Sequence, residues 1–318
     1  MIITLTMNPS VDYLYKLEKL SPGNLNRVTL ISKMVGGKGI NAARVSAILG
    51  TNTIAMGIIG GNNGDFIEKE IASDKFIPRF TKVDKETRNC YVILDKDNQK
   101  TEINEYGFPI ENQTLNCIRK DVLSLISAEN VSIISFNGSL PTNCPLDFYS
   151  NLISDIRKID ANIKILLDTS GKALKRCLDS KTLPDIIKPN ETEIADLLDI
   201  PTTTNCQILR KEIKNNITLS KIPIIFVSLG SEGSLVKFNN IFYKVSFKKI
   251  DAINTQGSGD STVGGILSAI DRNKNEKEII KYGSAAGTAN AMNIKTGFLN
   301  MDDFDTAYKN LTITKIGD

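Results

Sequence analysis

Histidine is absent from the 318 residues of this chain. Its absence excludes a Ser-His-Asp triad, a Cys-His catalytic pair and a zinc site with histidine ligands. A general base must therefore come from an aspartate, glutamate, lysine, tyrosine or cysteine side chain.

Cysteine is scarce, and the five cysteines are widely spaced, without a Cys-x-x-Cys pair. A metal cluster or a redox pair is therefore not indicated. An odd number of cysteines without a secretion signal is typical of reduced thiols, so we expect a cytoplasmic protein. The cysteines are Cys90, Cys117, Cys144, Cys177 and Cys206.

Long apolar runs and a strong charge imbalance are also missing. The apolar stretch from Met1 to Met7 is too short for a signal peptide, and no run approaches the roughly 18–20 residues that a membrane helix needs. The net charge of +3, from 39 basic and 36 acidic residues, does not favour nucleic acid as a partner. We therefore expect a soluble protein that binds neither membrane nor nucleic acid, with 41% hydrophobic residues available for a core.

Short β-branched runs alternate with segments of helical length. Several runs are almost continuously apolar, such as 131–136 and 163–167, which is typical of strands covered on both faces. The alternation predicts an α/β fold, with helices on both sides of a mostly parallel sheet. The expected strands are 2–7, 53–59, 131–136, 163–168, 184–187 and 223–228, and the expected helices are 39–49, 64–72, 112–127, 146–159, 190–198, 206–217, 258–271 and 275–291.

Two stretches, 11–35 and 88–106, interrupt this alternation. Each resembles a pair of strands with alternating polar residues and no crossover helix between them. We interpret them as a small second sheet that projects from the main one. The sequence shows no internal repeat, low-complexity tract or linker, so residues 1–318 are expected to form one domain.

The strongest local pattern runs from Asn254 to Thr262 and reads Asn-Thr-Gln-Gly-Ser-Gly-Asp-Ser-Thr. Gly257 and Gly259 allow backbone N–H groups to converge on an anion, and the helix predicted after them adds its positive dipole end. Asp260 would lie in the first turn of that helix, beside the anion. The alternative is an ordinary N-capping aspartate after a glycine turn.

A second glycine turn runs from Gly36 to Gly39 and is followed by Asn41. Glycine lets a ligand approach the backbone closely, and Lys38 and Asn41 suit phosphate and sugar hydroxyl groups. The turn is not a Walker A loop, because Lys38 is followed by glycine rather than serine or threonine. The alternative is a turn that only begins a helix.

Asn190 and Glu193 follow a short apolar strand and lie three residues apart, so they would share one face of a first helical turn. An amide oxygen and a carboxylate suit Mg²⁺ held through water near phosphate groups. The alternative is a capping box, in which both side chains only satisfy backbone N–H groups.

Other turns also follow predicted strands, at Asn8 to Asp12, Asn137 to Pro141 and Ser228 to Gly233. Ligands of open α/β sheets bind beyond the carboxyl ends of the strands. Asp12 is a short carboxylate in such a place, suited to sugar hydroxyls. Each turn alone has a purely structural explanation, but several glycine turns and two carboxylates at the strand ends of one sheet indicate a ligand site.

Together these motifs resemble the PfkB (ribokinase-like) carbohydrate kinase family over essentially the whole chain. Asn254 to Asp260 is similar to the family motif Asp-Thr-x-Gly-Ala-Gly-Asp, with Asn254 and Ser258 as departures. Gly36 to Arg44 is similar to the family motif Gly-Gly-x-Gly-x-Asn. The resemblance implies an α/β, ribokinase-like three-layer sandwich with a mostly parallel central sheet and a small β-sheet lid, here formed by the two projecting strand pairs.

Within the family, the chain is most similar to the branch that contains 1-phosphofructokinase and tagatose-6-phosphate kinase. Lys38 suits a substrate that already carries a phosphate, and Thr87 to Cys90 and Met292 to Gly297 look closer to tagatose-6-phosphate kinase. The resemblance implies ATP-dependent conversion of tagatose 6-phosphate to the 1,6-bisphosphate, or alternatively of fructose 1-phosphate to fructose 1,6-bisphosphate. It also implies Mg²⁺ as a cofactor and a homodimer formed through the lid.

The resemblance assigns roles to individual residues. Asp260 stands at the position of the family's catalytic base, and the family's anion hole corresponds to Gly257, Ser258 and Gly259. Sugar-phosphate contacts match Asp12, Arg27, Gly37, Lys38, Asn41, Arg88 and Ser139. Nucleotide contacts match Lys188, Asn190, Glu193, Ser228, Gly230, Gly233, Thr255, Gly287 and Asn290, with Asn190 and Glu193 also near the metal ion.

Three other functions compete with this interpretation. A kinase of nucleosides or unphosphorylated sugars is disfavoured by Lys38. An NAD-dependent Rossmann enzyme needs Gly-x-Gly-x-x-Gly, which Thr262 interrupts. A non-catalytic sugar-phosphate sensor is disfavoured by the intact Asp260.

Overall fold

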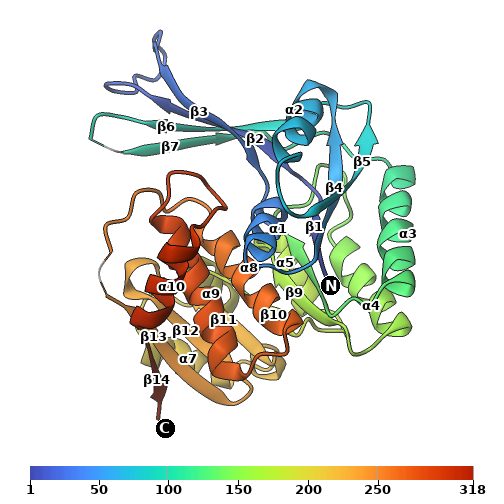
Figure 1. Ribbon diagram of the computed structural model, residues 1–318, viewed down its shortest axis with the longest axis vertical. Helices are drawn as coiled ribbons and strands as arrows, with labels where there is room; N and C mark the ends of the chain where they lie inside the picture. Colours follow the sequence, from blue (N-terminus) through green and yellow to red (C-terminus); the bar gives the residue numbers. More distant parts are fainter. Residues whose placement is uncertain (98, 249, 318) are drawn as a thin grey trace.

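The computed structural model describes residues 1–97, 99–248 and 250–317 and contains one large and one small sheet (Figure 1). The strands of the large sheet are β1 (Ile2–Thr6), β4 (Thr53–Gly60), β5 (Ile77–Val83), β8 (Ile133–Asn137), β9 (Lys164–Asp168), β10 (Ile186–Ile187), β11 (Ile224–Ser228), β12 (Ser234–Phe238), β13 (Ile241–Phe247) and β14 (Leu311–Ile316). Their order is β14-β13-β12-β11-β10-β9-β8-β1-β4-β5. Neighbours from β11 to β5 pair in parallel, and only β12, β13 and β14 add antiparallel pairs, so the predicted mostly parallel sheet is confirmed.

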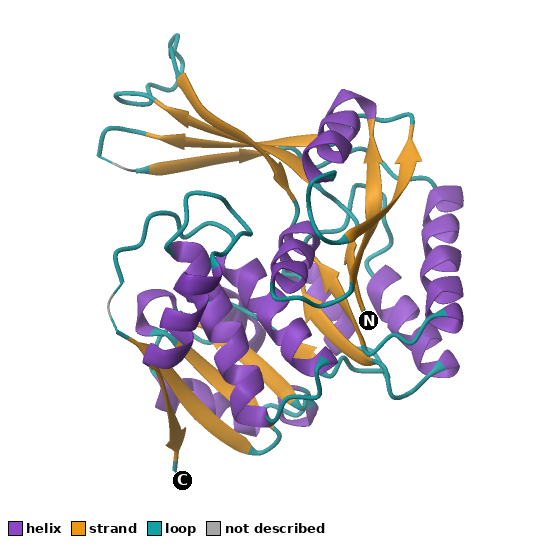
Figure 2. Cartoon of the chain, in the orientation of Figure 1, coloured by secondary structure: helices purple, strands orange, loops and turns teal. Residues whose placement is uncertain are grey.

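Helices cover both faces of this sheet, as Figure 2 shows. One layer contains α1 (Lys38–Ile48), α8 (Ser258–Asp271), α9 (Glu276–Ala291) and α10 (Met301–Asn310). The other contains α3 (Asn112–Ala128), α4 (Phe148–Ile159), α5 (Gly171–Leu178), α6 (Glu191–Leu198) and α7 (Cys206–Asn215). Helix α2 (Gly61–Ile71) packs with α1 against β4, and two short 3₁₀ helices, η1 (Leu219–Lys221) and η2 (Gly230–Glu232), flank β11. Within the described residues, no helix has the length and apolar character needed to cross a membrane.

The apolar strands supply both cores, which explains their continuous hydrophobicity. In β9, Leu166 packs into the core under α8 and α9, while the next residue, Leu167, packs into the core under α3 and α4. A strand buried on both faces needs an apolar residue at every position rather than at every second one. The three-layer sandwich predicted from this pattern is confirmed.

The small sheet comprises β2 (Ser10–Lys16), β3 (Thr29–Gly36), β6 (Arg88–Leu94) and β7 (Lys100–Asn104), in the order β3-β2-β6-β7. It projects from the body above α9 and α10 (Figure 1). The two stretches predicted to form a second sheet, 11–35 and 88–106, supply these strands, and residue 98 lies outside the described residues. Because β2 follows β1 after three residues and β3 leads directly into α1, the base of this sheet adjoins the carboxyl end of the central strand.

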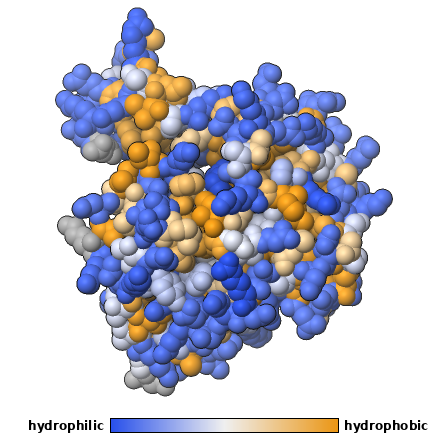
Figure 3. All heavy atoms as spheres, in the orientation of Figure 1, coloured by the Kyte–Doolittle hydropathy of each residue, from blue (hydrophilic) through white to orange (hydrophobic). Residues whose placement is uncertain are grey.

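The small sheet carries a group of aromatic and aliphatic side chains. Tyr13, Tyr15 and Tyr91 stack with ring centroids 5.4–6.4 Å apart. Ile103, paired with Tyr91 in the strand register, is 53% exposed, and Leu30 and Ile31 on β3 are 50% and 54% exposed. The space-filling view shows apolar surface where this sheet projects (Figure 3). We call Tyr13, Tyr15, Tyr91, Leu30, Ile31 and Ile103 the apolar strip.

Candidate active site

A cleft of about 330 Å³ lies between the small sheet and the carboxyl ends of the central strands. Its wall comes from β2, β6 and β7, and its floor from the first turns of α1 and α8. The following predicted site residues line it: Asp12, Gly37, Lys38, Asn41, Arg88, Ser139, Gly257 and Asp260. Residues more than 240 positions apart in the sequence therefore meet in one cavity.

Helix α8 begins at Gly257, which has a φ of 76° and to which no described side chain provides a cap. A methyl group at Gly257 would lie 2.6 Å from Thr296 Cγ2, so the backbone shape and the space both require glycine here. By contrast, α6, α7, α9 and α10 each begin with an asparagine whose side chain accepts backbone N–H groups. The N–H groups and the dipole at the start of α8 are therefore available to an anion in the cleft, as predicted for the anion site.

Asp260 lies in the first turn of α8, beside these N–H groups. Its Oδ2 accepts a hydrogen bond from Asn41 Nδ2 at 2.9 Å. Burial raises the pKa of Asp260 above its ordinary value, while the charges of Lys38 and Lys188 and the Asn41 hydrogen bond act in the opposite direction. A carboxylate with a raised pKa is a stronger base than an exposed one, which suits proton abstraction.

Helix α1 also begins at a glycine, Gly37, with a φ of 130° and no cap from any described side chain. Two neighbouring glycines make room for site residues. A methyl group at Gly36 would lie 2.1 Å from Asp12 Oδ1, and one at Gly39 would lie 2.3 Å from Thr6 Oγ1. The glycine turn therefore lets the small sheet and β1 approach the start of α1 closely.

Asp168 is a central residue of the site that sequence reasoning missed. It ends β9, is 1% exposed, and its Oδ1 lies 3.4 Å from both Lys38 Nζ and Lys188 Nζ. Burial alone would raise the pKa of Asp168, but Lys188 and Lys38 outweigh it and lower that pKa below its ordinary value. In turn, Asp168 raises the pKa of Lys38, more than burial lowers it, so Lys38 stays an ammonium ion.

The criterion that selected Asp12, a carboxylate at the carboxyl end of a predicted strand, would also have found Asp168, the last residue of predicted strand 163–168. Lys188 follows β10 and is 6% exposed. Its Nζ lies 3.1 Å from where a methyl group at Gly259 would stand. The structure therefore brings a second lysine to the start of α8, where it shares Asp168 Oδ1 with Lys38.

The wall of the cleft presents Asp12 and Arg88. Asp12 accepts a hydrogen bond of 2.6 Å from Ser10 Oγ, and burial raises its pKa. Arg88 donates to Asn8 O at 3.1 Å and to the carbonyl of Glu105 at 3.0 Å, which fixes its guanidinium at the base of the small sheet. Arg27 is not among the lining residues, because it is exposed in the loop between β2 and β3.

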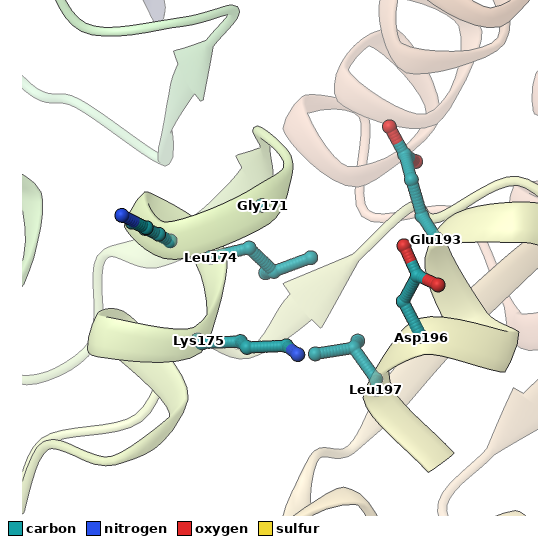
Figure 4. A pocket seen from close by; sticks show the side chains of 7 residues that line it. Gly171, Leu174, Lys175, Glu193, Asp196 and Leu197 are labelled. Atoms are coloured by element: carbon teal, nitrogen blue, oxygen red, sulfur yellow. The ribbon is translucent and has the colours of Figure 1, made fainter. Parts of the chain in front are cut away.

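Asn190 and Glu193 form a full capping box at the start of α6. Asn190 Oδ1 accepts from Thr192 N, Thr192 Oγ1 and Glu193 N, while Glu193 Oε2 accepts from Asn190 N at 3.0 Å. The Asn190 amide oxygen therefore caps α6, and its predicted contact with a metal ion through water stays a prediction. Glu193 keeps its other carboxylate oxygen, and it lines a pocket of about 150 Å³ between α5 and α6 (Figure 4).

The other predicted nucleotide residues lie beside this capping box or before α8. Ser228 ends β11 and bridges to Asn190, so both stand at adjacent strand ends. Gly230 and Thr255 are exposed. Packing alone also requires glycine at position 233, because a methyl group on Gly233 would lie 2.0 Å from the carbonyl oxygen of Val245. Their nucleotide contacts stay predictions.

Gly287 and Asn290 lie behind the anion site rather than on its surface. A methyl group at Gly287 would lie 2.3 Å from Thr262 Oγ1, so this glycine allows α8 and α9 to pack closely. Asn290 is fully buried, and its amide group bonds to Gln256 O, Ser258 Oγ and Ser261 Oγ. Both residues therefore support the turn from within, and their nucleotide contacts stay predictions.

Comparison with known proteins shows the family of this chain. The model of the pfkB family carbohydrate kinases matches residues 4–301. The chain is 38% identical over 316 residues to a tagatose-6-phosphate kinase of Staphylococcus epidermidis, covering 99% of this chain and 100% of that protein. Phosphofructokinase-2 of Escherichia coli, solved with substrates and products, superposes with a TM-score of 0.86 at 26% identity, covering 97% and 98% of the two chains. Its tetrameric inhibited form superposes with a TM-score of 0.82 at 25% identity, with the same coverage.

Proposed function

The chain belongs to the pfkB family of carbohydrate kinases, and we propose that it transfers the γ-phosphoryl group of ATP to the C1 hydroxyl of tagatose 6-phosphate. The family resemblance predicted from the sequence is thereby confirmed. ATP is the phosphoryl donor that such a kinase requires. The observation that carries the proposal is the position of Asp260, in the first turn of a helix without a side-chain cap and near the charges of Lys38 and Lys188.

The geometry supports a different role for each polar group in the cleft. Asp260 accepts the proton of the attacking hydroxyl group, and the N–H groups at the start of α8 stabilise negative charge on the transferring phosphoryl group. Lys188, against Gly259, adds a positive charge there. Lys38 and Arg88 bind the phosphate that the sugar already carries, and Asp12 accepts hydrogen bonds from sugar hydroxyls. Closure of the small sheet as a lid would exclude water from the transfer.

Magnesium fits the nucleotide side of the site through Glu193. The carboxylate has one oxygen outside the capping box and faces the pocket between α5 and α6. A carboxylate oxygen is a ligand that Mg²⁺ accepts directly or through water. When bound, Mg²⁺ would neutralise charge on the phosphate oxygens of ATP.

The alternative substrate is fructose 1-phosphate, since a lysine and an arginine recognise either ketose phosphate. ATP consumption should be measured with tagatose 6-phosphate, fructose 1-phosphate and fructose 6-phosphate in parallel. The proposal expects the highest kcat/KM with tagatose 6-phosphate. A higher value with fructose 1-phosphate would assign the chain to the alternative, and no turnover with any of them would reject the proposed function.

Glu193→Gln should raise the Mg²⁺ concentration that gives half-maximal rate. Glutamine can still accept the Asn190 N–H group, so the capping box survives while the negative charge is lost. Loss of a group that orients a metal typically costs about 10- to 100-fold in metal affinity, so we expect a shift of about tenfold or more. Glu191→Gln removes a charge from the same helical turn and is the matched control. If both variants reach half-maximal rate at the same Mg²⁺ concentration, Glu193 serves only as a helix cap.

A homodimer is the assembly that the apolar strip favours. Leu30, Ile31 and Ile103 of the strip are about half exposed beside the three stacked tyrosines, so one chain would leave apolar surface in water. The E. coli phosphofructokinase-2 has been solved as a tetramer, so oligomers occur among structural neighbours. We therefore expect two copies to pair through the small sheet, each burying the strip of the other.

Light scattering should give twice the chain mass of 34.9 kDa for the wild-type protein. Ile103→Glu places a charge at the β7 edge of the apolar strip and should give the mass of one chain. Ile217→Glu changes a residue that is 79% exposed beside η1, far from the small sheet, and should leave the mass unchanged. A wild-type monomer, or a dimer that Ile103→Glu leaves intact, would contradict this assembly.

A further inference from the structure

We propose that Arg44 is a positioning residue for the catalytic base: it orients the amide of Asn41, which in turn holds the carboxylate of Asp260. This inference rests on the proposed role of Asp260 and extends it to a side chain outside the lining of the cleft. It gives a functional role to Arg44, the last residue of the motif that runs from Gly36 to Arg44.

Three polar contacts connect these side chains in sequence. Arg44 lies one helical turn after Asn41 on α1, and its Nη1 donates to Asn41 Oδ1 at 3.1 Å. Asn41 Nδ2 donates to Asp260 Oδ2 at 2.9 Å. Arg44 is itself anchored by Asp74, whose Oδ2 lies 2.9 Å from Arg44 Nε. All these groups are largely protected from water, with Arg44 14% and Asp74 17% exposed.

The chemistry of the groups makes this order of contacts directional. A guanidinium group can only donate, so the Asn41 oxygen must face Arg44. The Asn41 amide must then present its nitrogen to Asp260, where a donor stabilises the carboxylate. If the amide turned over, its oxygen would face the carboxylate and repel it. Arg44 therefore selects the Asn41 amide orientation that holds Asp260 through Oδ2 alone. The other carboxylate oxygen, Asp260 Oδ1, is left for the substrate.

Arg44 also contacts the loop that closes over Asn41. The same Nη1 lies 3.4 Å from Thr296 O and 3.5 Å from Gly297 O. A methyl group at Gly297 would lie 2.4 Å from Asn41 Oδ1, so this loop packs directly on the amide. The loop and Arg44 together confine the Oδ1 end of the Asn41 side chain, which limits its rotation.

Several charged groups face Asp260 and contribute to its titration. Lys38 reaches it from α1, Asp168 from the end of β9 and Lys188 from the segment after β10. The Asn41 hydrogen bond lowers the pKa of Asp260, against burial, which raises it. Loss of that bond should raise the pKa of Asp260 further, so that protonation disables the base at a higher pH.

The test is the titration of the Asp260 carboxyl carbon by ¹³C NMR in the substrate-free protein, with the resonance assigned from Asp260→Asn. Arg44→Met should raise the pKa of Asp260 by about one unit, the scale of one hydrogen bond to a charged group. The acid limb of the kcat–pH profile should move by the same amount. The KM values for ATP and the sugar phosphate should stay within about twofold, because Arg44 binds neither.

A second experiment uses the Asn41→Leu variant. It distinguishes an effect of Arg44 through the Asn41 hydrogen bond from a direct effect of the Arg44 charge on Asp260. Asn41→Leu removes the intermediate amide, so Arg44→Met should cause no further shift when added to it. An equal shift in the Asn41→Leu background would show that Arg44 acts only through its charge and would overturn the proposal. So would an unchanged Asp260 titration in Arg44→Met.

Arg157→Met is the matched control for stability. Arg157 is 19% exposed, pairs with Asp185 and donates to the carbonyl of Ile163, far from the cleft. It should lower thermal stability without moving the titration. If Arg44→Met does not fold, Arg44→Lys serves instead, because a lysine that pairs with Asp74 cannot also reach Asn41, and it should give the same shift. The NMR readout needs no substrate, so inactive wild-type protein would reject the proposed function without affecting this test.

Discussion

Asp260→Asn should lower kcat by about 10²–10⁴-fold, the usual range for loss of a general base. Asparagine has nearly the same shape and can keep the first turn of α8, but it has no basic oxygen to accept the hydroxyl proton. Asn41 Nδ2 could still donate to the new side chain, so the local structure should persist. The chain contains no histidine that could take over this role.

The measurements are kcat and the affinities for ATP and sugar phosphate, on protein whose folding is verified. Both ligands should bind within a few-fold of the wild-type affinity, because neither bound ground state requires the proton transfer. The melting temperature should not fall, since removing a partly buried carboxylate removes its desolvation cost. A kcat within about fivefold of the wild-type value would reject Asp260 as the base.

Lys38→Ala should lower kcat/KM for the sugar phosphate by about 10- to 100-fold, because a charge-assisted contact is worth roughly 1.5–3 kcal/mol. The KM for ATP should change little, because Lys188 and the start of α8 remain to bind phosphate. The loss leaves Asp168 with one lysine instead of two, so some loss of stability is expected.

Lys158→Ala is the control for Lys38→Ala, because it removes a lysine that is 73% exposed and paired with Asp155 on α4. It should leave both kinetic constants unchanged. Equal losses toward ATP and the sugar phosphate in Lys38→Ala would reassign Lys38 to the nucleotide. No loss at all would show that Arg88 alone suffices for the substrate phosphate.

The buried parallel strands could be predicted because each must be apolar on both faces, as 133–137 and 164–168 are. The antiparallel extension, β12 to β14, was not predicted. In β12 the pattern is broken by Lys237, which is only 3% exposed and donates its ammonium hydrogens to the carbonyls of Ser220 and Ile222. A buried lysine satisfied by distant carbonyls makes a core strand look half-exposed.

The short helices were missed for a different reason. Helix α5 has eight residues, three of them Lys172, Lys175 and Arg176, so its buried stripe is too brief for a periodic signal. Helix α10 is longer, but it buries only Phe304 and Ala307. Both are helical mainly because neighbouring elements offer a surface on which their few apolar residues pack, as α9 does for Phe304 of α10 through Tyr282.

The site could be predicted where residues are adjacent in the sequence, as in the turns at Gly37 and Gly257. The contacts between turns could not, because they depend on which strands are neighbours. Asp168 meets Lys38 and Lys188 only because β9 lies between β8 and β10. Likewise, the role of Arg44 becomes visible only when α1 and α8 lie side by side and Asn41 faces Asp260.

The contrast among the helix starts has a consequence for the unliganded protein. Four helices begin with asparagine caps, whereas α1 and α8 begin with glycine at the cleft and have no cap from a described side chain. Under the proposed function, the phosphates of the substrates would accept these N–H groups and so stabilise the folded protein as well as react in it. A ligand that binds only the folded state adds to its stability in proportion to the logarithm of its concentration. Metabolite supply would then govern how long each molecule survives in its folded form.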